Sequence, residues 1–246
     1  MATRALPNTD KINSKTIMIQ RGITKGLPIT LGYIPIALTF GVLAKQAGMS
    51  VAEITLMSVL VYAGASQLVG AGMIAVGTGA IEIIVTTFVL NFRHFVMSLS
   101  FMNRLRGLGL EWKVPLSFGL TDESFSVASL HTEESKQENG MYFYAAMMIT
   151  AYLSWIFGSF LGGVLGEIIP ARLSQSMGIA LFAMFIGLLV PSVKKELKVG
   201  LIAILAMLVN YHLQLIPFVS EGWAIVLGTI IGGLSGVFLW EGDKRA

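Results

Sequence analysis

The sequence predicts an all-α, polytopic membrane helix bundle with about seven or eight membrane segments, some of them broken or re-entrant. Three observations support this fold class. Of the 246 residues, 54% are hydrophobic and 13% are charged, whereas a soluble domain carries about 25% charged residues. The mean hydropathy is +0.75. The apolar residues fall in blocks of about 20, the length that crosses the roughly 30 Å hydrocarbon core of a bilayer.

Eight apolar segments follow one another along the chain. The seven clearer ones are residues 27–46, 54–76, 83–101, 141–165, 177–193, 199–216 and 222–240, and the weaker one is residues 114–130. They predict a single transmembrane domain at residues 26–241, with a short tail at residues 242–246. Residues 1–25 are polar and basic, and we expect them to form a disordered cytoplasmic leader.

Two segments contain residues that interrupt a helix. Residues 62–67 (Tyr-Ala-Gly-Ala-Ser-Gln) place small and polar side chains in the middle of segment 54–76. In segment 114–130, Thr121 has the position of a helix N-cap, with Asp122 and Glu123 in the first turn. Broken half-helices present free amide or carbonyl ends that can hold charged ligands within a membrane. Segment 27–46 contains Pro28 and Pro35, which favour a kink.

Glycine, with 27 residues, is concentrated inside the spans. Gly158, Gly162 and Gly166 recur at four-residue spacing in segment 141–165. Small residues at this spacing let membrane helices pack closely. We therefore assign these glycines to helix packing.

Lysine and arginine indicate the orientation of the second half of the chain. One loop contains Lys194, Lys195 and Lys198, and Lys244 and Arg245 end the chain. Two spans separate these groups, and cytoplasmic loops of membrane proteins carry an excess of basic residues. We therefore expect both groups inside, with residues 167–176 outside.

The first half allows three topologies. Three full crossings from a cytoplasmic leader would place Arg104, Arg106 and Lys113 outside, against the distribution of basic residues in membrane proteins. Residues 114–130 would then have to cross as well, giving eight crossings. Alternatively, two of the first four segments turn back without crossing, which requires support from protein or a water-filled cavity. In the third topology the leader lies outside and seven segments cross.

Asn91, Arg93 and His94 stand inside the apolar segment 83–101. An arginine at the centre of a membrane helix costs roughly 3 kcal/mol on insertion scales, so Arg93 needs a partner, a cavity or a route to a headgroup. On a helix, Asn91 and His94 share a face and Arg93 points elsewhere. We therefore expect Arg93 and His94 to meet one ligand only if the helix unwinds near Asn91. Otherwise the polar face packs against other helices and Arg93 reaches the headgroups.

Other polar residues have alternative roles. At membrane depth, Asp122 and Glu123 would pair with Arg93 or with the ammonium group of a substrate; in a loop they would be solvated. Ser66 and Gln67 either bind substrate or satisfy a kink. The polar residues at positions 210–214 are expected to hydrogen-bond between helices. His131 is expected to be a solvated loop residue.

Composition excludes several kinds of site. Since the chain has no cysteine, it has no disulfide, thiolate metal site or cysteine nucleophile. The net charge of +3 comes from basic residues at span ends, which is explained by membrane orientation rather than by nucleic-acid binding. We expect no catalytic residue, no metal site and no cofactor.

Taken in order, Gly64-Ala65-Ser66-Gln67, Asn91-Phe92-Arg93-His94 and Thr121-Asp122-Glu123-Ser124-Phe125 resemble the motifs of the AzlC-type branched-chain amino acid permease family. Residues 32–44 are also similar, so the resemblance covers roughly residues 25–130. It implies an exporter of valine, leucine and isoleucine in the bacterial inner membrane, driven by the proton-motive force. It also implies a second, small membrane subunit of the AzlD type.

These motif positions define the expected site. We expect Ser66, Gln67, Asn91, Arg93 and Asp122 to bind substrate, because a zwitterion needs donors for its carboxylate and acceptors for its ammonium group. We expect His94, Asp122 and Glu123 to couple transport to protons.

Two other classes remain open. One is an exporter or channel for another small solute. The other is an intramembrane serine protease that pairs Ser66 with His94 or His212, although Gln67 stands where such a protease has a small residue.

Overall fold

The structure is a computed structural model that describes residues 9–105, 108–170 and 179–241. Every regular element in these ranges is a helix: α1 (Thr9–Gln46), α2 (Val51–Leu60), α3 (Gly64–Ala75), α4 (Ala80–Arg104), α5 (Leu110–Phe118), α6 (Asp122–Leu130), the 3₁₀ helix η1 (Thr132–Lys136), α7 (Gly140–Leu165), α9 (Ile179–Lys195), α10 (Leu197–Gln214) and α11 (Glu221–Glu241). Within them, α1, α4, α7 and α10 are long and apolar enough to cross a membrane. The predicted all-α polytopic fold is confirmed.

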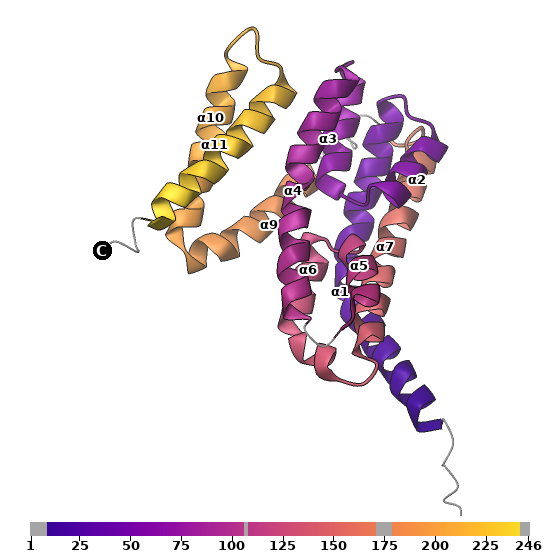
Figure 1. Ribbon diagram of the computed structural model, residues 1–246. Helices are drawn as coiled ribbons and strands as arrows, with labels where there is room; N and C mark the ends of the chain where they lie inside the picture. The colour runs from indigo at the N-terminus through magenta and orange to yellow at the C-terminus, as the bar shows by residue number, and fades with distance from the viewer. Residues whose placement is uncertain (1–8, 106–107, 171–178, 242–246) are drawn as a thin grey trace, which may run out of the picture.

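The most extensive contact between two helices joins α1 and α7, which run parallel (Figure 1). A Cβ atom built on Gly22 would lie 2.3 Å from the carbonyl oxygen of Phe143, and one on Gly41 would lie 2.3 Å from that of Ser159. Since both partners advance together along the two helices, the contact is parallel and its backbones nearly touch. In lipid, such close packing replaces hydrophobic burial as the source of helix association. The packing role expected for glycine is confirmed here, also at Gly162 against Leu38.

The expected disordered leader is wrong for residues 9–25, because α1 already begins at Thr9. This first part of α1 is held by the start of α7 and the loop before it. Met18 is buried, and the Arg21 guanidinium donates to the buried Glu134 carboxylate. Residues 1–8 lie outside the described residues.

Segment 54–76 is a helical hairpin rather than one span. The Gln67 side-chain amide donates to Ser58 Oγ at 2.9 Å, and a Cβ on Gly70 would lie 3.4 Å from Met57. As α3 advances, its partners on α2 move backward, so the two helices are antiparallel. The hairpin therefore starts and ends beside the C-terminal ends of α1 and α7, where Ile54 contacts Gly163.

Segment 114–130 forms a second hairpin that enters from the opposite end of the bundle. The ring of Trp112 on α5 lies 5.4 Å from that of Tyr142 near the start of α7, and Gly119 is packed against Met148. After the turn, α6 runs back until the His131 carbonyl accepts a hydrogen bond from the Tyr144 hydroxyl at 2.7 Å. Both predicted breaks are confirmed, and two of the first four segments turn back.

The four hairpin helices are each about half a membrane thick. They contain 10, 12, 9 and 9 residues, which corresponds to about 14–18 Å at 1.5 Å per residue, against roughly 30 Å of hydrocarbon. The tips of the two hairpins, at residues 61–63 and 119–121, consequently meet near the middle of the bundle. The long helix α4 passes both tips.

The last two helices, α10 and α11, form an antiparallel pair beside this bundle (Figure 1). Gly228 lies against Asn210 and Gly232 against Ala206. The pair is joined to the bundle where Glu82, at the start of α4, accepts hydrogen bonds from Ser220 and from the Gly222 amide. Since α11 starts at this end, Lys198 at the start of α10 lies at the other end. Arg104 and Lys113 lie at that end too, in agreement with the clustering of basic residues on one side.

The contact of α1 with α7 predicts different effects for one substitution at two positions of α1. Gly41→Ala forces a methyl group against the α7 backbone and should destabilise the protein by about 1–3 kcal/mol. Gly32→Ala, where a Cβ meets nothing within 4 Å, should be neutral or stabilising because alanine favours helix. Thermal unfolding in detergent measures both, and equal effects would contradict the proposed packing.

The two hairpins predict the sidedness of four positions. Ala52→Cys, in the first turn of α2, and Ala80→Cys, at the start of α4, mark the two outer ends of the first hairpin. Glu111→Cys, in the first turn of α5, and Glu133→Cys, in η1, mark those of the second. Because the chain contains no native cysteine, a membrane-impermeant maleimide reports each position cleanly. The members of each pair should label from the same side, and the two pairs from opposite sides. Labelling of one pair from both sides would show that its segment crosses the membrane.

Candidate functional site

The two hairpin tips enclose a small cavity with α1, α4 and α7. Its lining residues come from all of these elements: Tyr33, Tyr62, Ala63, Gly64, Ala65, Arg93, His94, Thr121, Asp122, Glu123 and Trp155. We call this space the charged cavity. Of the seven site residues expected from the sequence, Arg93, His94, Asp122 and Glu123 line it, and Ser66, Gln67 and Asn91 do not.

Arg93 and Asp122 form an ion pair that joins α4 to the tip of the second hairpin. Arg93 Nη1 lies 2.8 Å from Asp122 Oδ2, and the side chains are 36% and 24% exposed, respectively. The expected pairing of Arg93 with Asp122 is confirmed. Asp122 and Glu123 begin a half-helix at the middle of the bundle, so the alternative of a solvated loop is wrong.

The second tip is held by its own cap and by α1. Thr121 is the predicted N-cap of α6, and its hydroxyl accepts from the Ser124 amide at 3.2 Å. The Tyr33 hydroxyl lies 2.6 Å from Thr121 Oγ1 and 2.6 Å from Glu123 Oε2. A tyrosine hydroxyl has one hydrogen to donate, and the carboxylate of Glu123 is the stronger acceptor. Tyr33 thus orients Glu123 toward the cavity.

Arg93 and His94 both line the charged cavity although α4 is helical throughout Ala80–Arg104. The expectation that the helix would have to unwind near Asn91 is wrong. Neighbouring residues on a helix point about 100° apart, and both side chains nevertheless line the space between the two hairpin tips. The cavity therefore extends around the helix far enough to include both side chains.

Gln67 lies behind the cavity wall and holds the first tip together. It is completely buried. Its side-chain oxygen accepts hydrogen bonds from Trp155 Nε1 at 2.9 Å and from the Ala63 amide at 3.3 Å, while its nitrogen donates to Ser58. With these contacts Gln67 ties both helices of the hairpin to α7.

Ser66 and Asn91 join the first hairpin to α4. The Ser66 hydroxyl donates to Asn91 Oδ1 at 2.6 Å, and Ser66 is 1% exposed. Asn91 precedes Arg93 by two residues on α4, about 3 Å along the helix axis. Ser66, Gln67 and Asn91 therefore set the position of the first tip relative to the ion pair.

Sequence reasoning missed the aromatic part of the site. The Trp155 ring lies 5.4 Å from the Tyr33 ring, edge to face, and a Cβ on Gly64 would lie 2.5 Å from the indole. Trp155 and Tyr33 stand within apolar spans, where no pattern separates them from packing residues. Tyr62 was recognised only as part of a break.

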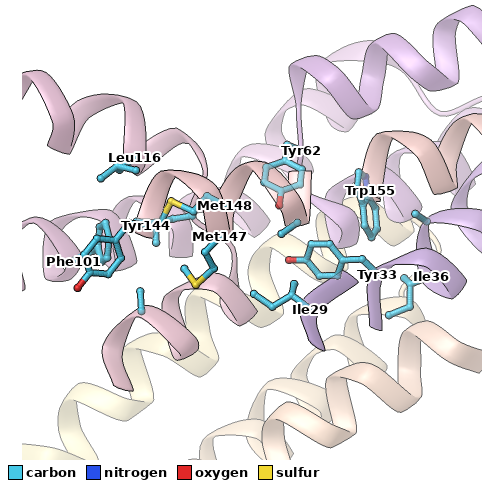
Figure 2. Packing of buried hydrophobic residues seen from close by; sticks show 14 of the residues in the cluster. Ile29, Tyr33, Ile36, Tyr62, Phe101, Leu116, Tyr144, Met147, Met148 and Trp155 are labelled. Carbon is cyan, nitrogen blue, oxygen red and sulfur yellow. The ribbon is translucent and has the colours of Figure 1, made fainter. Parts of the chain in front are cut away.

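Tyr62, at the tip of the first hairpin, has an unfavourable backbone conformation. Its φ is +44°, a left-handed conformation that costs a residue with a side chain about 1–3 kcal/mol. Among the described residues its buried hydroxyl makes no hydrogen bond of ordinary geometry, and its polar neighbour is the Tyr33 hydroxyl. Figure 2 shows Tyr62, from the tip of the first hairpin, and Tyr33, from α1, reaching the same region, with Trp155 beside Tyr33.

The ends of the half-helices carry opposite charge in this cavity. The N-terminus of α3 has no side-chain cap and no acidic residue in its first turn, so its free amides offer a positive potential. Asp122 and Glu123 occupy the first turn of α6 and make that end negative. The cavity measures only about 30 Å³, enough for a few water molecules and too little for an amino acid.

Two polar groups outside the cavity differ from expectation. Gln214 hydrogen-bonds to Asn210 at 3.1 Å within α10, whereas interhelical bonding was expected. His131 is half-buried, with Nδ1 2.9 Å from the Val127 carbonyl oxygen, and is not simply solvated.

At the C-terminal ends of α1 and α7, Lys45 in the last turn of α1 pairs with Glu167 just after α7. Lys45 Nζ lies 2.8 Å from Glu167 Oε1. The hydrogen bond from Lys45, together with its charge, lowers the pKa of the Glu167 carboxyl group. Because Glu167 is well exposed, the pair is screened by water and adds little stability.

The structure is that of a polytopic membrane protein with discontinuous helices, whose tips carry ionisable side chains to the middle of the bundle; transporters use this architecture to hold charged ligands. A family model described as AzlC protein matches residues 28–169. The chain belongs to the AzlC family.

Named relatives agree with this membership. An uncharacterized membrane protein of Archaeoglobus fulgidus is 30% identical over 94% of this chain and 98% of its own length. The inner membrane protein YgaZ of Escherichia coli K12 is 29% identical over 90% of this chain and 91% of its own. The branched-chain amino acid transport protein AzlC of Bacillus subtilis 168 is 24% identical over 70% and 66%. No solved structure matches.

The contacts of Gln67 predict that Gln67→Ala destabilises the protein even without substrate. The substitution leaves the buried Trp155 and Ser58 groups unpaired, at about 1–3 kcal/mol. Gln214→Ala, at an exposed position of α10, is the matched control and should change stability by about 0.5 kcal/mol or less. Thermal unfolding in detergent compares the two. Equal stability of both variants would return Gln67 to the list of direct substrate ligands.

Proposed function

We propose that this chain is a secondary transporter that exports the branched-chain amino acids valine, leucine and isoleucine across the bacterial inner membrane, driven by proton antiport. One observation carries the proposal: a partly accessible Arg93–Asp122 ion pair lies where two half-membrane hairpins meet. An ionisable residue at this depth marks a substrate or proton path in membrane proteins. Sequence similarity to a protein named for branched-chain amino acid transport supports the proposed substrates.

The zwitterionic part of an amino acid matches the charges around the cavity. Its carboxylate would bind Arg93 and the free amides of α3, and its ammonium group would bind Asp122 and Glu123. In doing so the substrate replaces the Arg93–Asp122 contact by two equivalent contacts. Without substrate, the ion pair compensates the charges of Arg93 and Asp122. The site therefore stays electrically balanced while the empty transporter changes from one access state to the other.

Of the residues expected to bind substrate, the geometry supports direct contact for Arg93 and Asp122. Ser66, Gln67 and Asn91 are assigned to positioning. Ser66 and Asn91 hydrogen-bond to each other, and Gln67 hydrogen-bonds to Ser58 and Trp155. Tyr33 orients Glu123.

Proton coupling is assigned to the acidic end of the cavity. Arg93 balances one carboxylate, so Asp122 and Glu123 together leave one negative charge in excess. A proton bound there compensates this charge. His94 stands beside the pair as a third titratable side chain of the cavity. We propose that Glu123, Asp122 and His94 accept the proton that enters as substrate leaves.

The hairpins provide a mechanism for alternating access. With about 30 Å³ free, the site must widen to admit an amino acid. Because one hairpin enters from each end, withdrawing either tip opens the cavity toward one side only. Transporters built from discontinuous helices alternate by moving one half against the other.

A small AzlD-type membrane subunit is proposed as partner. Support on this chain comes from α10, for which the structure describes no buried residue, so that its apolar surface must be covered by lipid or by protein. We also propose that the start of α1 lies in the cytoplasm, at the end where Arg104 and Lys113 gather.

The competing classes find less support. As an intramembrane protease, the chain would need the Ser66 hydroxyl to meet His94, but this hydroxyl donates to Asn91 and does not line the cavity. An open channel is disfavoured by the small volume of the cavity.

The test is leucine flux in proteoliposomes that contain the chain with its small partner. Wild type should show saturable leucine transport driven by a pH gradient. In Glu123→Gln the rate of this uphill transport should fall by about tenfold or more. The variant should retain leucine exchange at equal pH, because exchange needs no net proton movement.

A variant at an exposed position of η1, Glu133→Gln, serves as the control and should transport as wild type does. Unchanged gradient-driven transport in Glu123→Gln, Asp122→Asn and His94→Gln would refute the proton assignment. No amino acid flux in wild type would refute the proposed substrate.

A further inference from the structure

Tyr62 stands between the charged cavity and two larger apolar cavities. It lines all three. One neighbour, of about 400 Å³, lies between α4, α5 and the first tip and includes Met102, Val114 and Leu120; we call it the α4-side cavity. The other, of about 490 Å³, lies on the opposite side of α5 and includes Ile149 and Tyr152; we call it the α7-side cavity.

The α4-side cavity is the better continuation of the charged cavity. The two share His94 as well as Tyr62, whereas the α7-side cavity shares only Tyr62. Its volume falls within the range of small-molecule sites, about 300–1,000 Å³. Moving the Tyr62 ring would join a site for charged groups to a site for an aliphatic group. An aliphatic amino acid has the same two parts, a charged backbone portion and an apolar side chain.

The state of Tyr62 fits a movable partition. Its backbone is left-handed, and its buried hydroxyl makes no hydrogen bond of ordinary geometry among the described residues, with only the Tyr33 hydroxyl as a polar neighbour. Such a hydroxyl deserves a functional explanation, since buried polar groups are almost always paired. A substrate carboxylate in the charged cavity would supply the acceptor.

We infer that the α4-side cavity receives the aliphatic side chain of the substrate and that Tyr62 is the gate between it and the charged cavity. This inference rests on the proposed amino acid transport and identifies the residues that set its specificity. Met102, Val114 and Leu120 contact the side chain, and Tyr62 contacts the carboxylate through its hydroxyl.

The experiment fills each apolar cavity in turn. Val114→Phe narrows the α4-side cavity, and Ile149→Phe is the matched control in the α7-side cavity. Both native side chains are about half exposed, 50% and 54%, so neither substitution disturbs the core. Transport of leucine and of valine is measured for each in proteoliposomes with the partner subunit. Val114→Phe should lower the leucine-to-valine ratio roughly tenfold, since leucine is longer by one methylene, and Ile149→Phe should leave it unchanged.

The outcomes separate this inference from the proposed function. If wild type transports both amino acids and Val114→Phe leaves the ratio unchanged, or Ile149→Phe shifts it equally, the inference is refuted and the proposed function stands. If wild type transports no amino acid, both fall. Tyr62→Phe adds a second readout: with its ring intact but no hydroxyl, it should raise the KM for both substrates without changing their ratio. An unchanged KM would refute the carboxylate contact.

Discussion

The close parallel contact of α1 and α7 supports every other part of the site. Gly41 and Gly162 let these backbones approach, and the side chains that face away from the contact receive the two hairpins. Trp155 of α7 binds the first hairpin through Gln67, and Tyr33 of α1 binds the second through Thr121 and Glu123. Short helices inside a bilayer need such support, because their unpaired backbone ends cannot be solvated by lipid.

The ion pair and the hairpins together explain why charges are tolerated at the middle of this bundle. Arg93 faces Asp122, the hydroxyl of Tyr33 solvates Glu123, and the free amides of α3 lie across the cavity. Each charged group therefore has a counterpart from a different element. A displacement of either tip changes the solvation of the charged groups on the other elements, which couples opening of the site to its charge state.

The sequence predicted the fold class, both helix breaks and the Thr121 cap, because composition, glycine and capping residues act locally. It also predicted Arg93 and Asp122 as partners, because a membrane arginine requires compensation. It left open whether residues 54–76 and 114–130 cross, since hydropathy does not distinguish a hairpin from a span of equal length. The roles of Gln67 and Trp155 depend on a contact across 88 positions, which no local pattern reveals.

The separation of these contacts along the chain has a consequence for biosynthesis. The first hairpin emerges from the ribosome long before α7, yet the indole that completes the hydrogen bonds of Gln67 belongs to α7. Until then the hairpin carries a polar tip without its permanent partner, and contacts between residues distant in sequence form slowly. The nascent chain must therefore shelter this tip in the insertion machinery or at the membrane surface, and a chain truncated before Trp155 should be a substrate for membrane quality-control proteases.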